Sequence, residues 1–557
     1  MIGRRRIKKE AVNILLGFIL CSLPPFLLAQ NPTSPTQDST ERMKVEIVNT
    51  DILNFEKRDE VSIKKLIGNV HLIQDSTIFL CDSAYHFETE NRLEAYSQVR
   101  VIMSDSVQLT GERLEYDMNT RIAEVYDNIE LINGNTRLIT DRLTYYREET
   151  YGYYSEGGTL KDTANTLSSI YGYYYPNQEL AYFKEEVILV NPDYILETDT
   201  LGYNTETRVA SFLSPTLITS DRGEIQTNKG YYDTLNEKIR LYNRASVADS
   251  SYTLFADSLD YNSDTELGLA FGEVIVKQAD SSLMVIGEFG RFNRSTNESF
   301  ITDNAVAIQF MQEDTLFMFA DTLYSLEDSF GNRTFKAYNN LSFFMGEMQG
   351  VADSLVYQYA DSNIILYQDP VIWSDQSQIT GDTIFVQMKY NQPDSMWIGK
   401  NGFMVSKEDT VGFNQVKGKE IQAKFKDNAL VRLHVIGNSE SIYFSKNDEG
   451  NYEGMNQALS QEMIIMLRDN TAYRIIFLAN PEGTFKPIYE VLFQENKLEN
   501  MKWRINERPL QPPLDEEGIP SPRTPSFHSE LERLIPDPAP ADSILTTPPL
   551  KKEELRP

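Results

Sequence analysis

A segment of about 29 residues recurs along most of the chain, and this period limits what the chain can fold into. It shows as a ladder of apolar residues, the first eight of which lie 29 or 30 positions apart: Leu72, Val101, Leu131, Leu160, Leu189, Ile218, Val247 and Val276. Longer steps extend the ladder through Ile308, Phe343, Trp373, Val405 and Val435. Such a period predicts an array in which each unit buries its apolar face against its neighbours, without a single central core.

An acidic residue recurs in step with the ladder: Asp82, Glu112, Asp141, Asp199, Asp257, Asp321, Asp353 and Asp382. Paired carboxylates can hydrolyse glycosides, but such a catalytic pair is unique in its chain, whereas these acids are iterated. Iteration indicates a structural role, such as a carboxylate at a turn or bulge that accepts backbone N–H groups.

The pattern within each unit is typical of strands. Over residues 92–103, apolar and small side chains alternate with polar ones, which predicts a strand with one covered face. Over residues 107–118 the apolar parity switches, which predicts a bulge or sharp twist near Glu112. We therefore expect an all-β chain with two main strands per unit, and no long stretch shows helical periodicity.

Composition removes several classes of function. The chain has 557 residues and a formal net charge of −30, which disfavours binding to nucleic acid or to bare anionic membranes. Its four histidines lack metal-ligand spacing, and it contains no phosphate-binding loop or nucleophile motif. We expect no enzymatic activity, no cofactor and no metal site.

The chain divides into five expected segments. Residues 1–29 have the basic start, apolar stretch and small-residue end of a cleaved signal peptide, with an uncleaved anchor as the alternative. Residues 30–43 form a linker, 44–435 the repeat array, 436–508 a β-rich cap with a hairpin, and 509–557 a disordered, proline-rich tail. Cys81, in a slot held by Gly111 and Thr140 in later units, is expected to be a small packed residue.

Two copies of the repeat, at residues 68–72 and 272–276, resemble the OstA-like family, which includes the periplasmic lipopolysaccharide-transport protein LptA and the N-terminal domain of the translocon LptD. The resemblance implies an elongated, V-shaped antiparallel β-jellyroll in the periplasm, whose apolar interior carries lipid A acyl chains. It also implies head-to-tail assembly with an inner-membrane export complex and an outer-membrane translocon that have similar jellyrolls. Carried over by position, the candidate groove residues are Val70, Leu72, Val99, Val101, Ile129, Leu131, Val187, Leu189, Val274 and Val276.

Two questions stay open at the level of sequence. The apolar ladder fits a packed core as well as an open slot for lipid. An open slot predicts that a charge at Val101 or Leu131 weakens lipopolysaccharide binding without unfolding the chain. The period also fits a parallel β-helix, either an exported adhesin or a carbohydrate-acting protein, and an envelope scaffold that carries no lipid.

Overall fold

The computed structural model describes residues 45–510, except 59–60, 104–106, 312–314, 391, 409–411, 427–428, 448, 469–470 and 492–495. The chain divides into two parts, Met1–Lys44 and Val45–Pro557, and every described residue belongs to the second. The expected signal peptide, the linker and nearly all of the expected tail therefore lie outside the described residues.

The described residues form thirty-eight strands and three short 3-10 helices. The first strands are β1 (Glu46–Asn49), β2 (Ile52–Arg58), β3 (Val61–Gln74), β4 (Thr77–Phe87), β5 (Arg92–Ile102), β6 (Val107–Asp117), β7 (Ile122–Asn133), β8 (Thr136–Tyr146), β9 (Tyr151–Tyr154), β10 (Gly158–Lys161), β11 (Thr166–Ser169) and β12 (Tyr171–Tyr175). After η1 (Pro176–Gln178) come β13 (Leu180–Asn191), β14 (Tyr194–Asn204), β15 (Val209–Phe212), β16 (Thr216–Ser220), β17 (Gly223–Thr227), β18 (Lys229–Asp233), β19 (Lys238–Tyr242), β20 (Ala245–Ala248), β21 (Tyr252–Ala256) and β22 (Ser258–Asn262).

The remaining strands are β23 (Leu267–Gln278), β24 (Leu283–Asn293), β25 (Glu298–Phe310), β26 (Thr315–Glu327), β27 (Arg333–Met345), β28 (Met348–Gln358), β29 (Asn363–Tyr367), β30 (Val371–Ser374), β31 (Ser377–Thr380), β32 (Thr383–Lys389), β33 (Gln392–Glu408), β34 (Gly412–Lys426), β35 (Ala429–Lys446), β36 (Tyr452–Arg468), β37 (Thr471–Leu478) and β38 (Glu482–Pro487). The last two 3-10 helices are η2 (Ile488–Glu490) and η3 (Ile505–Glu507). No helix in this part of the chain has the length and apolar character to cross a membrane.

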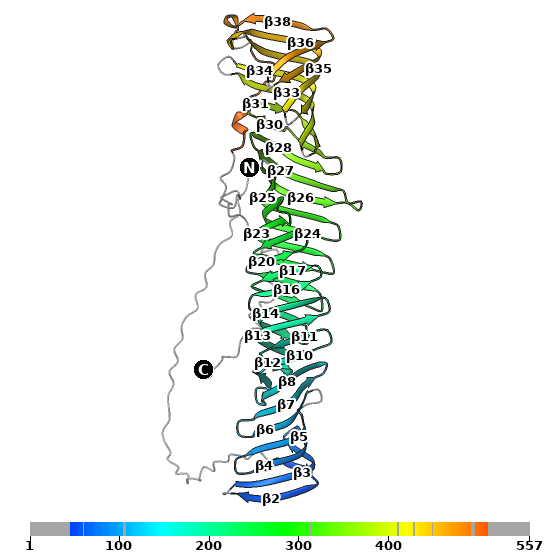
Figure 1. Cartoon of the computed structure of the whole chain (residues 1–557), viewed down its shortest axis with the longest axis vertical. Coiled ribbons are helices and arrows are strands. Elements are labelled where there is room, and N and C mark those ends of the chain that lie inside the picture. Colours follow the sequence, from blue (N-terminus) through cyan, green and yellow to red (C-terminus); the bar gives the residue numbers. More distant parts are fainter. Residues whose placement is uncertain are drawn as a thin grey trace, which may run out of the picture. The chain divides into compact units, whose positions relative to one another are not determined.

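Neighbouring strands pair antiparallel throughout the described residues, and most pair with the strand before and the strand after (Figure 1). Some strands are interrupted, so one long strand faces two short ones in turn, as β14 faces β15 and β16. A parallel β-helix requires parallel neighbours, and the antiparallel ladders rule it out for this part of the chain.

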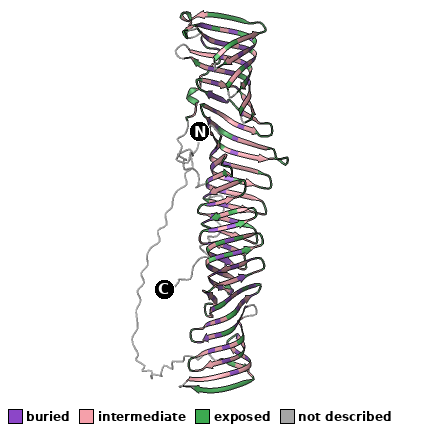
Figure 2. Cartoon of the chain, viewed as in Figure 1, coloured by how far each residue is buried: buried purple, intermediate pink, exposed green. Residues whose placement is uncertain are grey.

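Buried residues alternate with more accessible ones along many of the strands, and Figure 2 colours the chain by burial. In β5, for example, Leu93, Ala95, Val99 and Val101 are buried, whereas the arginine and glutamine between them are exposed. The expected covered face is confirmed, because apolar side chains two residues apart point the same way.

Pairs of left-handed residues bend the long strands. Each pair sits where the register of the ladder shifts, so two residues on one strand oppose one on the next, as in a β-bulge. The pairs include Gly68 and Asn69, Ser97 and Gln98, Asp127 and Asn128, Glu185 and Glu186, Gly272 and Glu273, Asp303 and Asn304, Asn339 and Asn340, Lys400 and Asn401, and Gly437 and Asn438. They recur with the period of the sequence, so the bends fall in line from strand to strand. We call each pair a hinge.

Repeated acids face six of these nine hinges, whereas Lys419 and Gln461 face the last two. The register leaves Asp82, Glu112, Asp141, Asp199, Asp321 and Asp353 as the single unpaired residues opposite them. Several accept hydrogen bonds from hinge side chains: Ser97 Oγ donates to Asp82 at 2.7 Å, Asn340 Nδ2 to Asp321 at 3.0 Å, and Asn401 Nδ2 to Asp382 at 3.1 Å. The structural interpretation of the acids is confirmed, although these donors are side chains rather than the expected backbone N–H groups.

The aligned hinges fold the continuous sheet into two layers whose inner faces pack together. Phe79 and Tyr116, which lie on opposite sides of the hinge line, stack with their ring centroids 5.7 Å apart. One hydrophobic cluster runs through the interior from Leu66 on β3 to Ile465 on β36. The prediction of a repetitive antiparallel β-jellyroll is therefore confirmed.

The downstream end of the apolar ladder is a correction to the sequence analysis. The inner row that begins at Val276 continues through Val285, Ala307, Met318 and Phe343. Ile308, Trp373 and Val405 instead lie on the opposite, outward face of the same sheet. In these strands consecutive residues are apolar, so both faces carry apolar side chains. The units are also longer here, and counting one residue too far along a strand selects a side chain on the opposite face.

Near the C-terminal end, β36 and β37 form the expected hairpin, with Arg468 paired to Thr471 and Met463 to Phe477. Strand β35 runs across the proposed boundary between residues 435 and 436, so the cap continues the ladder of the array. The boundary between array and cap stays a prediction.

We predict that the hinges tolerate glycine and reject β-branched residues. Asn340→Val places a branched side chain at φ 53° and removes the bond to Asp321, so it should lower the free energy of unfolding by about 1–3 kcal/mol. Asn340→Gly removes the same bond and keeps the left-handed conformation accessible, so it should cost clearly less. Urea unfolding of both variants measures the difference, and equal losses would contradict a conformational role.

Candidate functional site

The interior between the two layers is the candidate site, because the candidate groove residues line it. Nine of the ten are almost completely buried in one cluster: Val70, Leu72, Val99, Val101, Ile129, Leu131, Val187, Leu189 and Val274. The tenth, Val276, is half-buried and packs against the same cluster. The structure therefore brings these residues together, but nine of them lie within a packed core.

A polar clasp joins the two layers near the N-terminal end of the array. The Arg147 guanidinium donates to the Gln74 side-chain oxygen at 2.8 Å and to the Tyr116 hydroxyl at 3.0 Å. It also reaches the Gln74 carbonyl at 3.2 Å and the Asp75 carboxylate at 3.1 Å. Because Gln74 and Tyr116 belong to different layers, Arg147 holds the open edge of the jellyroll shut at this level.

Two similar clasps follow along the array. The Asn133 amide donates to the Pro176 carbonyl at 2.9 Å and to the Glu179 carboxylate at 3.0 Å. The Asn165 amide donates to the Tyr203 hydroxyl at 2.9 Å. Asn133 and Asn165 are themselves buried, so these bonds are shielded from water. From β3 to about β16, the interior is consequently closed by its own side chains.

Part of the same interior becomes half-buried downstream of β16. The inner row that is fully buried at Leu189 and Leu196 is only half-buried at Ile225, Val247 and Leu254. Further half-buried inner residues are Val276, Val285, Phe292, Leu316, Phe335, Phe343, Met348, Tyr357, Ile364, Ile379, Val386 and Met404. We call this set the half-buried rows.

Strand length does not mark this change. β25, β26 and β27 have 13 residues each, but β3 in the closed part has 14. Rows close to the hinge stay buried, as at Ala337 and Leu341, while Phe335 and Phe343 at greater distance from it are half-buried. No local sequence pattern marks these rows, because Phe335 and Phe343 lie at the same distances from their hinge as the buried Leu93 and Val101.

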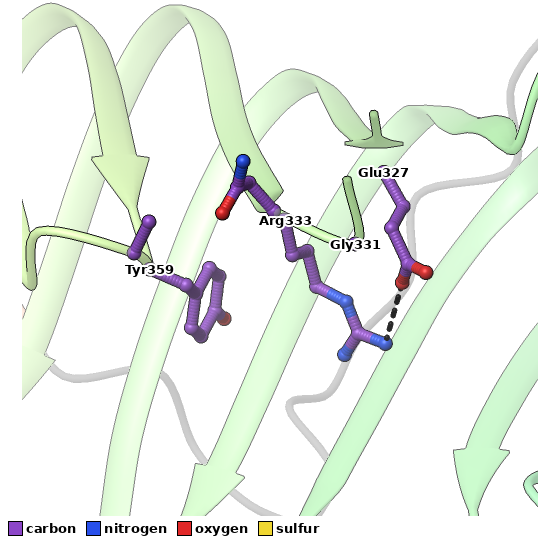
Figure 3. A pocket seen from close by; sticks show the side chains of 6 residues that line it. Glu327, Gly331, Arg333 and Tyr359 are labelled. Atoms are coloured by element: carbon purple, nitrogen blue, oxygen red, sulfur yellow. Dashed lines mark ion pairs between the residues drawn. The ribbon is translucent and has the colours of Figure 1, made fainter. Parts of the chain in front are cut away.

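A separate surface cavity lies at the turn between β26 and β27 (Figure 3). It has a volume of about 340 Å³ and is lined by Glu327, Gly331, Asn332, Arg333, Tyr359 and Ala360. Glu327 and Arg333 form an exposed ion pair at 3.5 Å across it. Its lining is polar and lies outside the apolar interior, so it is no extension of the candidate groove.

The buried thiol of Cys81 packs into the interior as expected from its slot, opposite Val70 on β3. Burial raises the pKa of this thiol to about 12, so it stays protonated at neutral pH. Elsewhere in the described residues, no group of three histidine, cysteine or acidic side chains is placed to hold a metal ion.

These features define a class of fold: a repetitive antiparallel jellyroll with an apolar interior between two layers. Residues 42–199 match the family model described as OstA-like protein, which confirms the family resemblance for β1 through most of β14. Among solved structures, LptH from Pseudomonas aeruginosa, the LptA-homologous periplasmic component of the lipopolysaccharide transport device, is 11% identical. That alignment covers 27% of this chain and 81% of that chain, with a TM-score of 0.14. The comparison with curated proteins found no match.

We predict that Arg147 stabilises the closed part of the array. Arg147→Ala removes three part-buried hydrogen bonds and an exposed one to Asp75, so the free energy of unfolding should fall by about 1–3 kcal/mol. Arg137→Ala is the matched control, because Arg137 is exposed and its ion pair with Glu130 is 3.7 Å long. Chemical unfolding compares the two, and an equal effect would contradict the clasp.

Cys81 should be unreactive in the folded chain. In protein that lacks residues 1–29, Cys81 is the sole cysteine. Its raised pKa keeps it neutral, so a thiol reagent at about pH 8 should label it only as fast as the chain unfolds. Because the unfolded thiol ionises near 8.5, stability should fall as the pH rises from about 8 towards 12. Rapid labelling of folded protein would show that the interior at β4 is open.

Proposed function

We propose that the chain is a periplasmic, non-enzymatic transport protein that binds lipopolysaccharide, with acyl chains held against the half-buried rows. The observation that carries this proposal is that an inner row buried at Leu189 and Leu196 becomes half-buried after β16, at Ile225, Val247 and Leu254. The OstA-like match of residues 42–199 supports the same class of function.

The half-buried rows have the chemistry that a hydrocarbon ligand needs. Phe292, Phe335, Phe343, Met348 and Ile364 are apolar, and each keeps part of its surface accessible. An acyl chain laid against them would remove that surface from water, which is worth about 25 cal/mol per Å² of apolar area. The lipid headgroup would remain in water at the open edge of the jellyroll.

Exposed apolar residues at both ends of the ladder support assembly with partners of similar fold. At the first strands, Ile52 and Phe55 are exposed, and at the last strands Tyr473 and Phe485 are exposed. An unpaired strand edge with apolar side chains is a template for a further strand. We propose that these edges pair with jellyroll domains of an inner-membrane export complex and of an outer-membrane translocon.

The groove candidates upstream of β16 have a different role in this proposal. Val101 and Leu131 belong to the closed part, so a charge at either position would be buried without a partner and should destabilise the fold. The earlier expectation that such a charge spares the fold therefore applies better to the half-buried rows.

The proposal is tested by binding of purified chain, without residues 1–29, to lipopolysaccharide. Phe335→Asp should weaken binding by about tenfold or more, because the charge lies where the acyl chain would lie. Thr334→Asp is the matched control, since it places the same charge on the next residue of β27, facing outward. Circular dichroism establishes that both variants are folded.

Two results would count against transport. Unchanged affinity in folded Phe335→Asp protein would remove the half-buried rows as the binding site. Absence of any lipopolysaccharide binding by the folded chain would favour the remaining alternative, an envelope scaffold without lipid cargo.

A further inference from the structure

A C-terminal segment crosses the outward face of the sheet at right angles to the strands. Residues 496–508 lie against three glutamines that belong to one cross-strand row: Gln415 on β34, Gln378 on β31 and Gln349 on β28. Successive pairings connect these glutamines through Val405 and Trp373. We call residues 496–508 the strap.

Two of the glutamines hold the strap by its backbone. Gln415 donates its amide to the Asn496 carbonyl at 2.8 Å and accepts the Leu498 N–H at 2.9 Å. Gln378 repeats the arrangement, donating to the Lys502 carbonyl at 2.8 Å and accepting the Arg504 N–H at 2.7 Å. Both glutamine side chains are only 1% exposed, so four strong polar contacts are satisfied away from water.

The strap also packs through its side chains. Leu498 joins a cluster on this face with Val405 and Ile442, and Trp503 lies 5.3 Å from the Phe413 ring. At its far end, Arg508 donates to the Gln349 side chain at 2.6 Å and to the Asp375 carbonyl at 2.9 Å. The strap is thus an established cover over the outward face from β36 to β28.

The row that guides the strap continues beyond it as an apolar surface. Beyond Gln349 it runs through Phe344, Phe317, Ile308 and Met284 and ends at the exposed Lys277. These side chains and their outward-facing neighbours form a second cluster, separate from the interior: Ile275, Met284, Ile286, Val306, Ile308, Phe317, Phe319 and Phe344. We call this cluster the outer patch.

Several side chains of the outer patch are shielded from solvent although they lie on the outward face of the sheet. Ile308 is 0% exposed and Ile286 is 2% exposed, although both point away from the interior. Upstream, outward apolar residues in the corresponding part of the sheet, such as Val190 and Ile195, are each 46% exposed. A sheet face with this degree of burial needs a cover over it.

We propose that the cover is the next part of this same chain, residues 511–520, which extends the strap across the outer patch. The described chain ends at Leu510, directly after Arg508 reaches β28, and it is moving towards the patch. The strap residues that bond to the three glutamines are 498, 504 and 508. Each glutamine lies two strands from the next, so the strap uses six and then four residues to cross two strands. About five residues per two strands, which are about 4.8 Å apart, places Leu514 near β27 and β26 and Ile519 near β25 and β24.

The composition of residues 511–520 suits this surface. Pro512, Pro513 and Pro520 lack the N–H of a ladder strand and favour an extended polyproline conformation. Such segments dock on aromatic-lined surfaces, and the outer patch presents Phe317, Phe319 and Phe344.

Limited proteolysis with a glutamate-specific protease tests the proposal in the chain without residues 1–29. Cleavage after Glu516 or Glu517 should be at least about tenfold slower than cleavage after Glu530 or Glu532, which lie beyond the docked segment. Phe317→Asp should abolish this protection, because a charge in the outer patch opposes an apolar cover. Phe300→Asp, an outward residue outside the patch, is the matched control and should leave it unchanged.

A pair of truncations keeps the test independent of folding defects. A chain that ends at Leu510 should expose the patch and bind several-fold more of an apolar fluorescent dye than the full chain. A chain that ends at Arg523 retains the docked segment and should bind dye like the full chain. Equal cleavage at the two pairs of glutamates, or no gain of dye after truncation at Leu510, would overturn the proposal. A full chain that sediments as a dimer through this face would also overturn it, because a second copy would then be the cover.

Discussion

The hinge of two left-handed residues facing one acid is the constraint on which the rest of the structure depends. A long antiparallel meander can fold into two facing layers only if its strands bend at matching points. Each hinge adds an extra residue to one strand, and this bends the strand locally. Glycine, asparagine and aspartate recur at the hinges because they tolerate positive φ, and the facing acid accepts bonds from hinge side chains in several units.

Once the sheet is folded along this line, the opposing layer decides how well an inner residue is covered. Val101 and Phe343 each lie three residues beyond a hinge, yet only Val101 is buried. Where the layers are clasped by residues such as Arg147, the interior is a core packed by its own side chains. Further along the array, inner residues such as Phe335 and Phe343 keep accessible surface. A sealed core and accessible apolar surface thus occupy different parts of one array that has a single local design.

The sequence was sufficient for the fold because its two periodicities are local. Alternation at period two identified the strands, and the 29-residue recurrence identified the array and its iterated acids. The packing of the site was less predictable. Val101 and Val276 occupy equivalent positions in the repeat, yet Val101 is buried and Val276 is half-buried. The exposure of each side chain depends on how the opposing layer packs over it. The face of Ile308 was misassigned because residues 305–308 are all apolar. The pattern therefore did not show which of them point inward. The strap depends on contacts between residues more than 80 positions apart, such as Gln415 and Leu498, and no local pattern encodes them.

Because each unit has its own hinge, the array can become longer or shorter by whole units. A duplicated unit would bring its own bend, its own facing acid and two more strands for each layer, and it would find the same neighbours as the unit it copied. The glutamine row prevents such an insertion near the C-terminal end of the array. Gln415, Gln378 and Gln349 are spaced two strands apart to match the chain that crosses them, so an insertion among these strands would put the contacts out of phase. Growth by duplication is therefore open to the N-terminal units and closed to the last third of the molecule.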